Sequence, residues 1–249
     1  MYKNLFKAKK AVIFDLDDTL VKTSPLWDAA LRSVCEGIGT VWPGFGRFVG
    51  VRLEVIWDRI VSDETYTKIT MPISELVQKT VQKFLQLVAE SDIEESEGFW
   101  ELVYELKEDK KFKIGLVSNS PRKVVESVFA KLGISQIFDA IVCGDEVKRP
   151  KPDSEMYKKA AKLLEVSPRH IVAFEDSPTG AKASVAAGCT TIVVYDATFS
   201  ESDYPKQVAT MISGFDDVVG RMDLTFRETL EKTAQQLEQE RKQEQTPQS

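Results

Sequence analysis

The chain has 249 residues, 43% of them apolar, and a formal net charge of −6. This apolar share suffices for a packed interior, and the longest apolar runs fall well short of the roughly 18 residues of a membrane span. Charges of both signs are interspersed, which argues against nucleic acid as a partner. The amino terminus lacks a signal-peptide core. We therefore expect a globular cytoplasmic protein that binds neither membranes nor nucleic acid.

The first predicted element is a buried parallel strand at Ala11–Phe14, because its residues are all apolar. It runs directly into the acidic cluster Asp15-Leu16-Asp17-Asp18-Thr19. Open α/β sheets bind ligands beyond the carboxyl ends of their strands, so this cluster marks the expected site of chemistry. Side chains alternate along an extended segment, so Asp15 and Asp17 are expected to face the same side.

Residues 22–96 are predicted to form a separate helical insert. Helical spacing of apolar residues predicts helices at Trp27–Cys35, Leu53–Ile60 and Ser74–Glu90. Two sets of insert residues admit two interpretations each. Trp42, Phe45 and Phe48 are either core residues or substrate contacts, and Arg47, Arg52 and Lys68 are either surface charges or contacts to a charged substrate.

After the insert, apolar strands alternate with helices. The predicted strands are Lys113–Val117, Ile137–Cys143, Ile171–Phe174 and Thr191–Val194, and the predicted helices are Val124–Leu132, Asp153–Glu165 and Thr179–Ala187. This alternation indicates an α/β fold: a Rossmann-like, three-layer core with a parallel sheet, here interrupted by a helical cap. We assign residues 1–21 and 97–225 to the core and 22–96 to the cap. Residues 226–249 are too polar for a core and form a helical or disordered tail.

Polar residues at four predicted strand ends suggest a common site. Asp15 and Asp17 follow the first strand, and Glu175 and Asp176 follow another. Several carboxylates meeting in one place suit Mg²⁺, which prefers hard oxygen ligands. Ser118 and Lys151 come from the two remaining strand ends, and a hydroxyl and an ammonium can hold phosphate oxygens. Together these residues predict a site that handles an anion.

These segments resemble, in order and spacing, the four motifs of the haloacid dehalogenase superfamily. The first motif is Asp15-Leu16-Asp17-Asp18-Thr19, the second ends in Ser118, the third supplies Lys151-Pro152, and the fourth is Glu175-Asp176-Ser177 with Gly180. The resemblance spans about residues 11–194. The insert between the first and second motifs is similar to the helical cap of the subclass that includes phosphoglycolate phosphatases and β-phosphoglucomutases.

The resemblance implies a two-step phosphoryl transfer. Asp15 would be the nucleophile that forms an aspartyl-phosphate, and Asp17 the general acid and base. Mg²⁺ would be bound by Asp15, the backbone carbonyl of Asp17, Asp176 and Glu175. The phosphate would be held by Ser118, Asn119, Lys151 and Thr19. Thr19 would also fix the loop or support Asp17.

The function that follows is a Mg²⁺-dependent phosphatase that hydrolyses a small phosphorylated metabolite. A phosphomutase of the β-phosphoglucomutase type, a dehalogenase and a non-catalytic binding protein are the alternatives. Trp27 stands where mutases of that type carry a histidine, which argues against the mutase. The Asp17 and Glu175–Asp176 carboxylates argue against the dehalogenase, which needs neither a second acid nor a metal.

Three further residues near the motifs have simpler interpretations. Asp18 is a tolerated loop residue, and Lys148 is a weaker rival of Lys151 for the ammonium role. His170, the single histidine, precedes an apolar strand and is expected to be structural.

Overall fold

The computed structural model describes residues 5–6, 8–44, 48–63, 69–108 and 112–219. The predicted tail at 226–249 lies outside this range, as do Phe45, Arg47 and Lys68. The predictions made for those residues therefore stay predictions.

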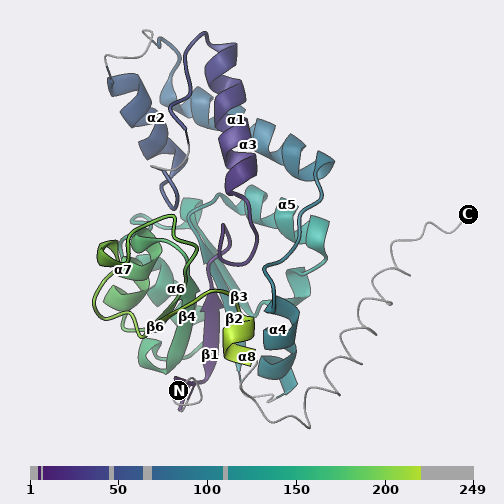
Figure 1. Cartoon of the computed structure of the whole chain (residues 1–249), viewed down its shortest axis with the longest axis vertical. Coiled ribbons are helices and arrows are strands. Elements are labelled where there is room, and N and C mark those ends of the chain that lie inside the picture. The colour runs from purple at the N-terminus through teal and green to yellow at the C-terminus, as the bar shows by residue number, and fades with distance from the viewer. Residues whose placement is uncertain (1–4, 7, 45–47, 64–68, 109–111, 220–249) are drawn as a thin grey trace, which may run out of the picture.

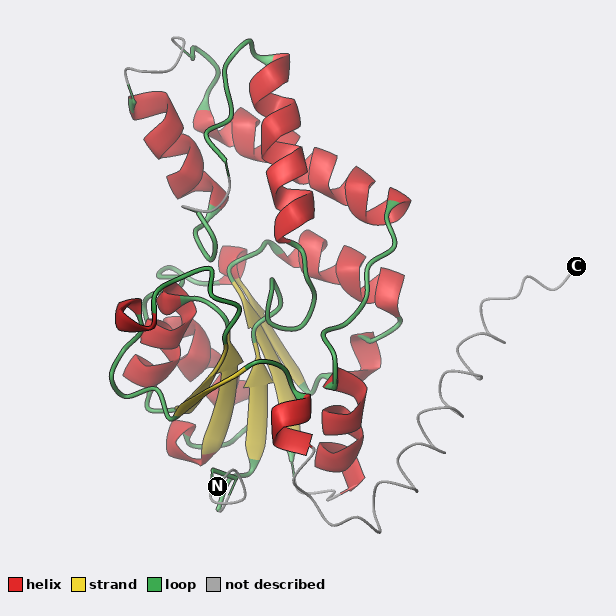
Figure 2. Cartoon of the chain, viewed as in Figure 1, coloured by secondary structure: helices red, strands yellow, loops and turns green. Residues whose placement is uncertain are grey.

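A six-stranded parallel sheet forms the centre of the molecule (Figures 1 and 2), in the order β3-β2-β1-β4-β5-β6. The strands are β1 (Ala11–Phe14), β2 (Lys113–Ser118), β3 (Ala140–Cys143), β4 (Ile171–Glu175), β5 (Thr190–Val194) and β6 (Thr210–Ile212). In the centre of the sheet Phe14 lies in register with Leu116 of β2 and Phe174 of β4. The parallel sheet and the Rossmann-like fold predicted from the sequence are thereby confirmed.

Helices cover both faces of the sheet. The helices are α1 (Ser24–Gly37), α2 (Leu53–Ser62), α3 (Ile73–Glu90), α4 (Phe99–Glu108), α5 (Arg122–Leu132), α6 (Glu155–Leu163), α7 (Pro178–Ala187) and α8 (Asp216–Val219). Buried residues of α4, α5 and α8 pack with Val12 and Phe14 of β1 on one face. Buried residues of α6 and α7 pack with Ala11 and Ile13 on the other. Successive side chains of β1 thus point to opposite faces of the sheet and contribute to a core on each side.

Aromatic rings fill the first of these cores. Phe14 stacks on Phe174 with ring centroids 5.2 Å apart, and Phe99 and Phe215 meet Phe14 edge-on at 5.6 Å. All four side chains are buried, and offset or edge-on rings add to the free energy gained from burial alone. This packing fixes the end of β1, directly before Asp15.

Helices α1, α2 and α3, called the cap helices below, gather at the carboxyl end of the strands (Figure 1). They share a small core that includes Leu31, Trp57 and Leu76. Trp42 and Phe48 stack on each other within this core. Of the two interpretations of these residues, core residue or substrate contact, the structure therefore agrees with the first. We propose the cap to be residues 22–96 and the core domain 1–21 and 97–225, as the sequence suggests.

Four elements differ from the sequence prediction. The predicted strand Ile137–Cys143 is shorter: Ser135–Ile137 is a 3-10 turn, and β3 begins at Ala140. Phe138 stacks on Phe129 of α5 at 4.8 Å, so these apolar residues pack against a helix before the strand starts. Helices α4 and α8 and strand β6 were not predicted.

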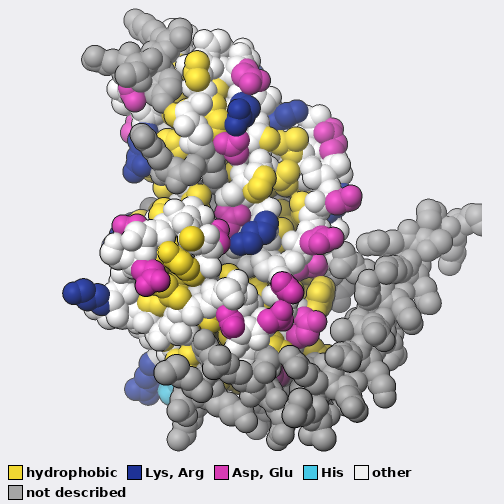
Figure 3. Space-filling view, in the orientation of Figure 1, with side chains coloured by type: hydrophobic (Ala, Val, Ile, Leu, Met, Phe, Trp, Pro, Cys, Tyr) yellow, Lys and Arg dark blue, Asp and Glu magenta, His cyan; other side chains and the backbone are white. Residues whose placement is uncertain are grey.

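The molecular surface carries charges of both signs. Among the described residues on the face drawn in Figure 3, lysine and arginine side chains are scattered among acidic ones and form no single basic patch. In the part of the chain that the structure describes, none of the helices combines the length and the apolarity that crossing a membrane requires.

Candidate active site

The carboxyl edge of the sheet brings the polar strand ends together. The backbone N–H of Asp15 donates to the carbonyl of Phe174 at 3.0 Å, which continues the ladder between β1 and β4. Glu175 is the last residue of β4 and Ser118 the last of β2, so both lie at the same edge as Asp15. Lys151 enters this edge from the loop that follows β3.

Lys151 is the centre of a buried ionic cluster. Its Nζ lies 2.5 Å from Asp15 Oδ1 and 2.7 Å from Glu175 Oε1. Burial alone would lower the pKa of Lys151, but the two carboxylates outweigh it and raise the pKa above its usual value. Lys148 and Arg149 are exposed, so Lys151 is the basic side chain of this loop that reaches the cluster.

Three carboxylates lie close together at this edge of the sheet, and two of them meet Lys151. One oxygen each from Asp15, Glu175 and Asp176 lies within 4.8 Å of the others, and all three residues are buried. Burial, reinforced by the negative charge of neighbouring carboxylates, raises the pKa of Asp15 and of Asp176 well above the usual value. Glu175 Oε2 is buried and has no hydrogen-bond partner among the residues that the structure describes. A hard divalent cation fits this donor set, because it would neutralise the crowded charge and give Oε2 a ligand partner.

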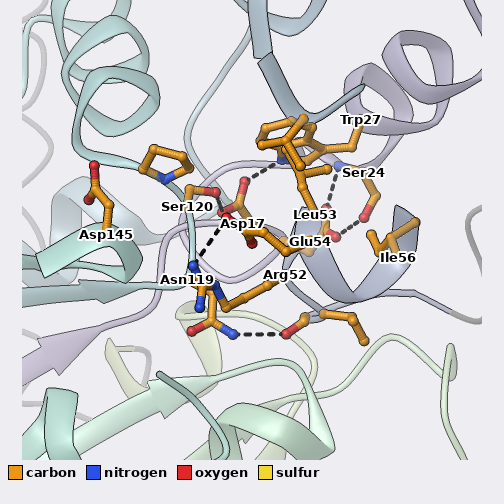
Figure 4. Close-up of a pocket in the computed structure, with 15 residues that line it drawn as sticks. Asp17, Ser24, Trp27, Arg52, Leu53, Glu54, Ile56, Asn119, Ser120 and Asp145 are labelled. Carbon is orange, nitrogen blue, oxygen red and sulfur yellow. Dashed lines mark hydrogen bonds and ion pairs between the residues drawn. The ribbon is translucent and has the colours of Figure 1, made fainter. Parts of the chain in front are cut away.

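Asp17 lies beside this cluster and is held by four donors. Its Oδ1 accepts hydrogen bonds from Thr23 Oγ1 at 2.6 Å and Trp27 Nε1 at 2.9 Å. Its Oδ2 accepts from Ser120 Oγ at 2.7 Å and Ser118 Oγ at 3.2 Å. Figure 4 shows Trp27 and Ser120 on opposite sides of the carboxylate. Core and cap residues therefore hold Asp17 jointly, since Trp27 belongs to α1, Ser118 ends β2 and Ser120 follows that strand.

Two predicted phosphate ligands make other contacts. The Thr19 hydroxyl is buried and donates to Asp176 Oδ1 at 3.0 Å. The Asn119 side chain accepts from the Lys151 backbone N–H at 3.1 Å and donates to the Gly50 carbonyl at 3.1 Å. Both side chains thus hold other site residues in place, and their proposed phosphate contacts stay predictions.

Asp18 fastens the cap to the core. Its carboxylate accepts hydrogen bonds from the backbone N–H and the hydroxyl of Ser24, the first residue of α1. It adopts φ +62°, a left-handed conformation that aspartate tolerates better than most residues. Burial raises the pKa of its carboxyl above the usual value. The sequence assigned Asp18 no role beyond the loop, whereas the structure gives it this anchoring contact.

Sequence reasoning did not find Tyr157. This tyrosine of α6 is buried, and its hydroxyl donates to Glu175 Oε1, the oxygen that also meets Lys151. An apolar-spaced helix gives no signal that one of its aromatic residues carries a polar contact. Ser177 has a local role, because its Oγ accepts a hydrogen bond from the Gly180 N–H and caps α7.

A pocket opens between the cap and this edge of the sheet (Figure 4). Its described lining consists of Asp17, Asp18, Ser24, Trp27, Gly50, Val51, Arg52, Leu53, Glu54, Ile56, Val77, Asn119, Ser120, Pro121 and Asp145. Gly50 belongs to the loop between α1 and α2, called the cap loop below, and brings it close to the core. Its φ is +73°, and an added Cβ would lie 2.7 Å from Ser177 Oγ. The pocket therefore has one wall from the cap and one from the carboxyl edge of the sheet, called the catalytic edge in the proposals below.

Comparisons with known proteins agree with this arrangement. The pattern of the haloacid dehalogenase-like hydrolase family matches residues 12–194. A phosphorylated carbohydrates phosphatase of Thermotoga maritima is 30% identical over 72% of this chain and 82% of its own length. Hexitol phosphatase B of Escherichia coli is 30% identical over 74% and 82%.

The fold also agrees with a solved structure. CbbY from Rhodobacter sphaeroides, solved in complex with phosphate, superposes with a TM-score of 0.77 over 84% of this chain and 96% of its own, at 23% identity. A family pattern that covers most of the chain, and relatives aligned over most of their length, carry the conclusion: the chain belongs to the haloacid dehalogenase-like hydrolases.

Proposed function

We propose that the protein is a phosphatase that removes the phosphate from a small phosphorylated metabolite. The observation that carries this proposal is the convergence of Asp15, Lys151 and the Glu175–Asp176 pair at one edge of the sheet, with Asp17 beside them. Two curated relatives bear names of phosphatases of phosphorylated carbohydrates and of hexitol phosphates, which supports the same class of substrate.

In the first half-reaction a carboxylate oxygen of Asp15 attacks phosphorus and forms an aspartyl-phosphate. The bond between phosphorus and the ester oxygen breaks, and Asp17 donates a proton to the departing alcohol. Lys151, whose ammonium lies against Asp15, and Ser118 neutralise and orient the transferred oxygens.

In the second half-reaction a water molecule attacks the aspartyl-phosphate. Asp17, now a carboxylate, accepts the proton of that water, and the bond from phosphorus to Asp15 breaks to release inorganic phosphate. Four hydrogen bonds already fix the Asp17 carboxylate, so its position requires little further ordering.

Asp15, Glu175 and Asp176 would hold Mg²⁺, together with the backbone carbonyl of Asp17 that the family resemblance implies. When bound, the ion supplies positive charge that favours the ionised nucleophile and its approach to an anionic phosphate. Thr19 orients Asp176 and Tyr157 orients Glu175, so each of these ligands has a neighbour that limits its rotation.

The contact between Trp27 and Asp17 favours the phosphatase over the mutase. A mutase needs a group that assists attack by a sugar hydroxyl, and here an indole N–H, which cannot accept a proton, occupies that place. His170 precedes β4 at the opposite end of that strand from Glu175, and its Nδ1 meets the Ala8 carbonyl. Water is therefore the better acceptor for the phosphoryl group.

The test is phosphate release from a panel of phosphorylated metabolites, in Mg²⁺ or in EDTA. We expect release that requires the metal and that Asp15→Asn abolishes. Absence of release from every compound by a folded protein would favour the mutase or the non-catalytic binding protein instead.

A further inference from the structure

Most of the charged residues that line the pocket between cap and core are acidic. Asp17, Asp18, Glu54 and Asp145 contribute carboxylates, whereas Arg52 is the single basic side chain among its described lining residues. A phosphate ester bound with its phosphorus at Asp15 would place its alcohol portion next to these carboxylates. The local charge therefore disfavours any second anionic group on that portion.

Arg52 does not act as a free cation in this pocket. Its Nη2 lies 3.1 Å from Glu54 Oε1, and its side chain is only 29% exposed. Glu54 lies in the first turn of α2, where a carboxylate is favoured by the helix dipole. An entering anion would have to replace or share this partner, and it would also meet the negative charge of Glu54 itself.

The loop that carries Arg52 is held against the core. Asn119 donates to the Gly50 carbonyl, and Gly50 packs closely on Ser177, at the start of α7. Because these contacts precede Arg52 by two residues, the ion pair has a defined position relative to the catalytic edge. It is thus part of the pocket and not only of the outer surface.

The remaining lining offers both apolar and hydrogen-bonding surface. Trp27, Leu53, Ile56 and Val77 supply apolar groups, and Ser24, Asn119, Ser120 and Asp145 supply polar ones. A chain or ring of CH–OH units presents both kinds of surface and carries no charge. Carboxylates in particular can accept hydrogen bonds from its hydroxyl groups.

We propose that this pocket selects phosphate monoesters of uncharged polyhydroxy compounds and rejects esters that carry a second anionic group, with Glu54 as the specificity-determining residue. This inference rests on the proposed phosphatase function. Glu54 acts by neutralising Arg52 and by adding negative charge to the pocket.

The experiment uses two probes of matched size. Glucitol 6-phosphate and 6-phosphogluconate have the same six-carbon chain, but one ends in a hydroxymethyl group and the other in a carboxylate. We expect kcat/KM to be about tenfold higher for glucitol 6-phosphate at low ionic strength, with the ratio falling as salt is added. Equal values, or a preference for 6-phosphogluconate, would overturn the proposal.

The variant Glu54→Gln tests the assigned residue. We expect the preference to fall by about threefold or more, through a rise in kcat/KM for 6-phosphogluconate, because Arg52 loses its charged partner. Glu75→Gln is the matched control, since Glu75 also forms a cap ion pair but is absent from the pocket lining. If Glu54→Gln has the same ratio of kcat/KM values for the two probes as the native protein, Glu54 does not determine the specificity.

Two further measurements separate this inference from the proposed function. Hydrolysis of p-nitrophenyl phosphate reports on the catalytic edge, because its leaving group lacks a second charge. Calorimetric binding of the two probes to Asp15→Asn measures selectivity without turnover, and tighter binding of glucitol 6-phosphate is expected. If nothing is hydrolysed but this binding preference holds, the phosphatase proposal fails and the pocket assignment stands. If p-nitrophenyl phosphate is hydrolysed but the binding preference is absent, the phosphatase proposal stands and the pocket assignment fails.

Discussion

The indole of Trp27 makes two contacts that a single substitution can separate. Its ring stacks on Phe84 of α3 with centroids 3.7 Å apart, and its N–H donates to Asp17. The first contact belongs to the packing of the cap, and the second reaches the proposed acid and base. Trp27 therefore links cap position to the orientation of Asp17.

Trp27→Phe should keep the stacking and remove the hydrogen bond. A hydrogen bond to a charged group contributes about 1.5–3 kcal/mol, so we expect kcat to fall roughly tenfold or more with a much smaller change in KM. Trp57→Phe is the matched control, because the Trp57 N–H donates to Thr80 inside the cap. Steady-state kinetics of both variants decide the matter, and equal kcat values would contradict a positioning role for Trp27.

Individual site residues differed in how far the sequence could place them. The motifs brought Asp15, Glu175 and Asp176 to one edge because they lie at strand ends, and Lys151 reaches it from the loop after β3. The hydrogen-bond partner of a side chain was harder to predict from the sequence. The direction of a hydroxyl depends on packing between segments that lie far apart in the chain. Thr19 donates to Asp176, a contact that the sequence did not indicate, and its expected contact with phosphate stays a prediction.

Among the elements, the length and spacing of the apolar residues decided which ones the sequence revealed. Helix α4 carries buried residues at Phe99, Leu102, Val103 and Leu106, a helical spacing that could have been recognised. Strand β6 has three residues and pairs only with β5 in the described sheet, so it leaves too short a pattern. The residues before β3 include apolar side chains that pack against α5. Apolarity alone does not distinguish such residues from those of a buried strand.

The loop between α1 and α2 offers a second test. Gly50 and Gly39 have nearly the same backbone conformation, with φ +73° and +72°, but an added Cβ meets Ser177 at Gly50 and open space at Gly39. Alanine at either position should cost about 1–2 kcal/mol from the left-handed conformation. Only Gly50→Ala should also displace the cap loop from the core.

We therefore expect Gly50→Ala to lower kcat/KM at least tenfold, while Gly39→Ala keeps the native value. Thermal denaturation of both variants separates stability from activity. If Gly50→Ala retains full activity, the contact between the cap loop and the core does not matter for turnover.

For the molecule as a whole, the carboxylate cluster connects metal binding to stability. A ligand that binds only the folded chain at about 100 times its Kd adds about 2.7 kcal/mol to the free energy of unfolding. For a chain of this size that corresponds to a rise in Tm of roughly 5–10 °C. We expect Mg²⁺ to produce this rise in the native protein.

Asp176→Asn should remove most of that rise, because it takes a carboxylate from the proposed ligand set. Asp92→Asn, a change at an exposed aspartate, is the control and should respond like the native protein. Calorimetric scans with Mg²⁺ and with EDTA measure the effect independently of activity. A full rise in Asp176→Asn would exclude this cluster as the metal site.

In the proposed mechanism Asp15 carries the phosphate covalently. Rapid quenching during turnover of a labelled phosphate ester, followed by cleavage with trypsin, should place the label in the peptide that ends at Lys22, and fragmentation should locate it on Asp15. Asp15→Asn should give no labelled peptide. Turnover by Asp15→Asn at the native rate, or a label on another residue, would contradict the mechanism.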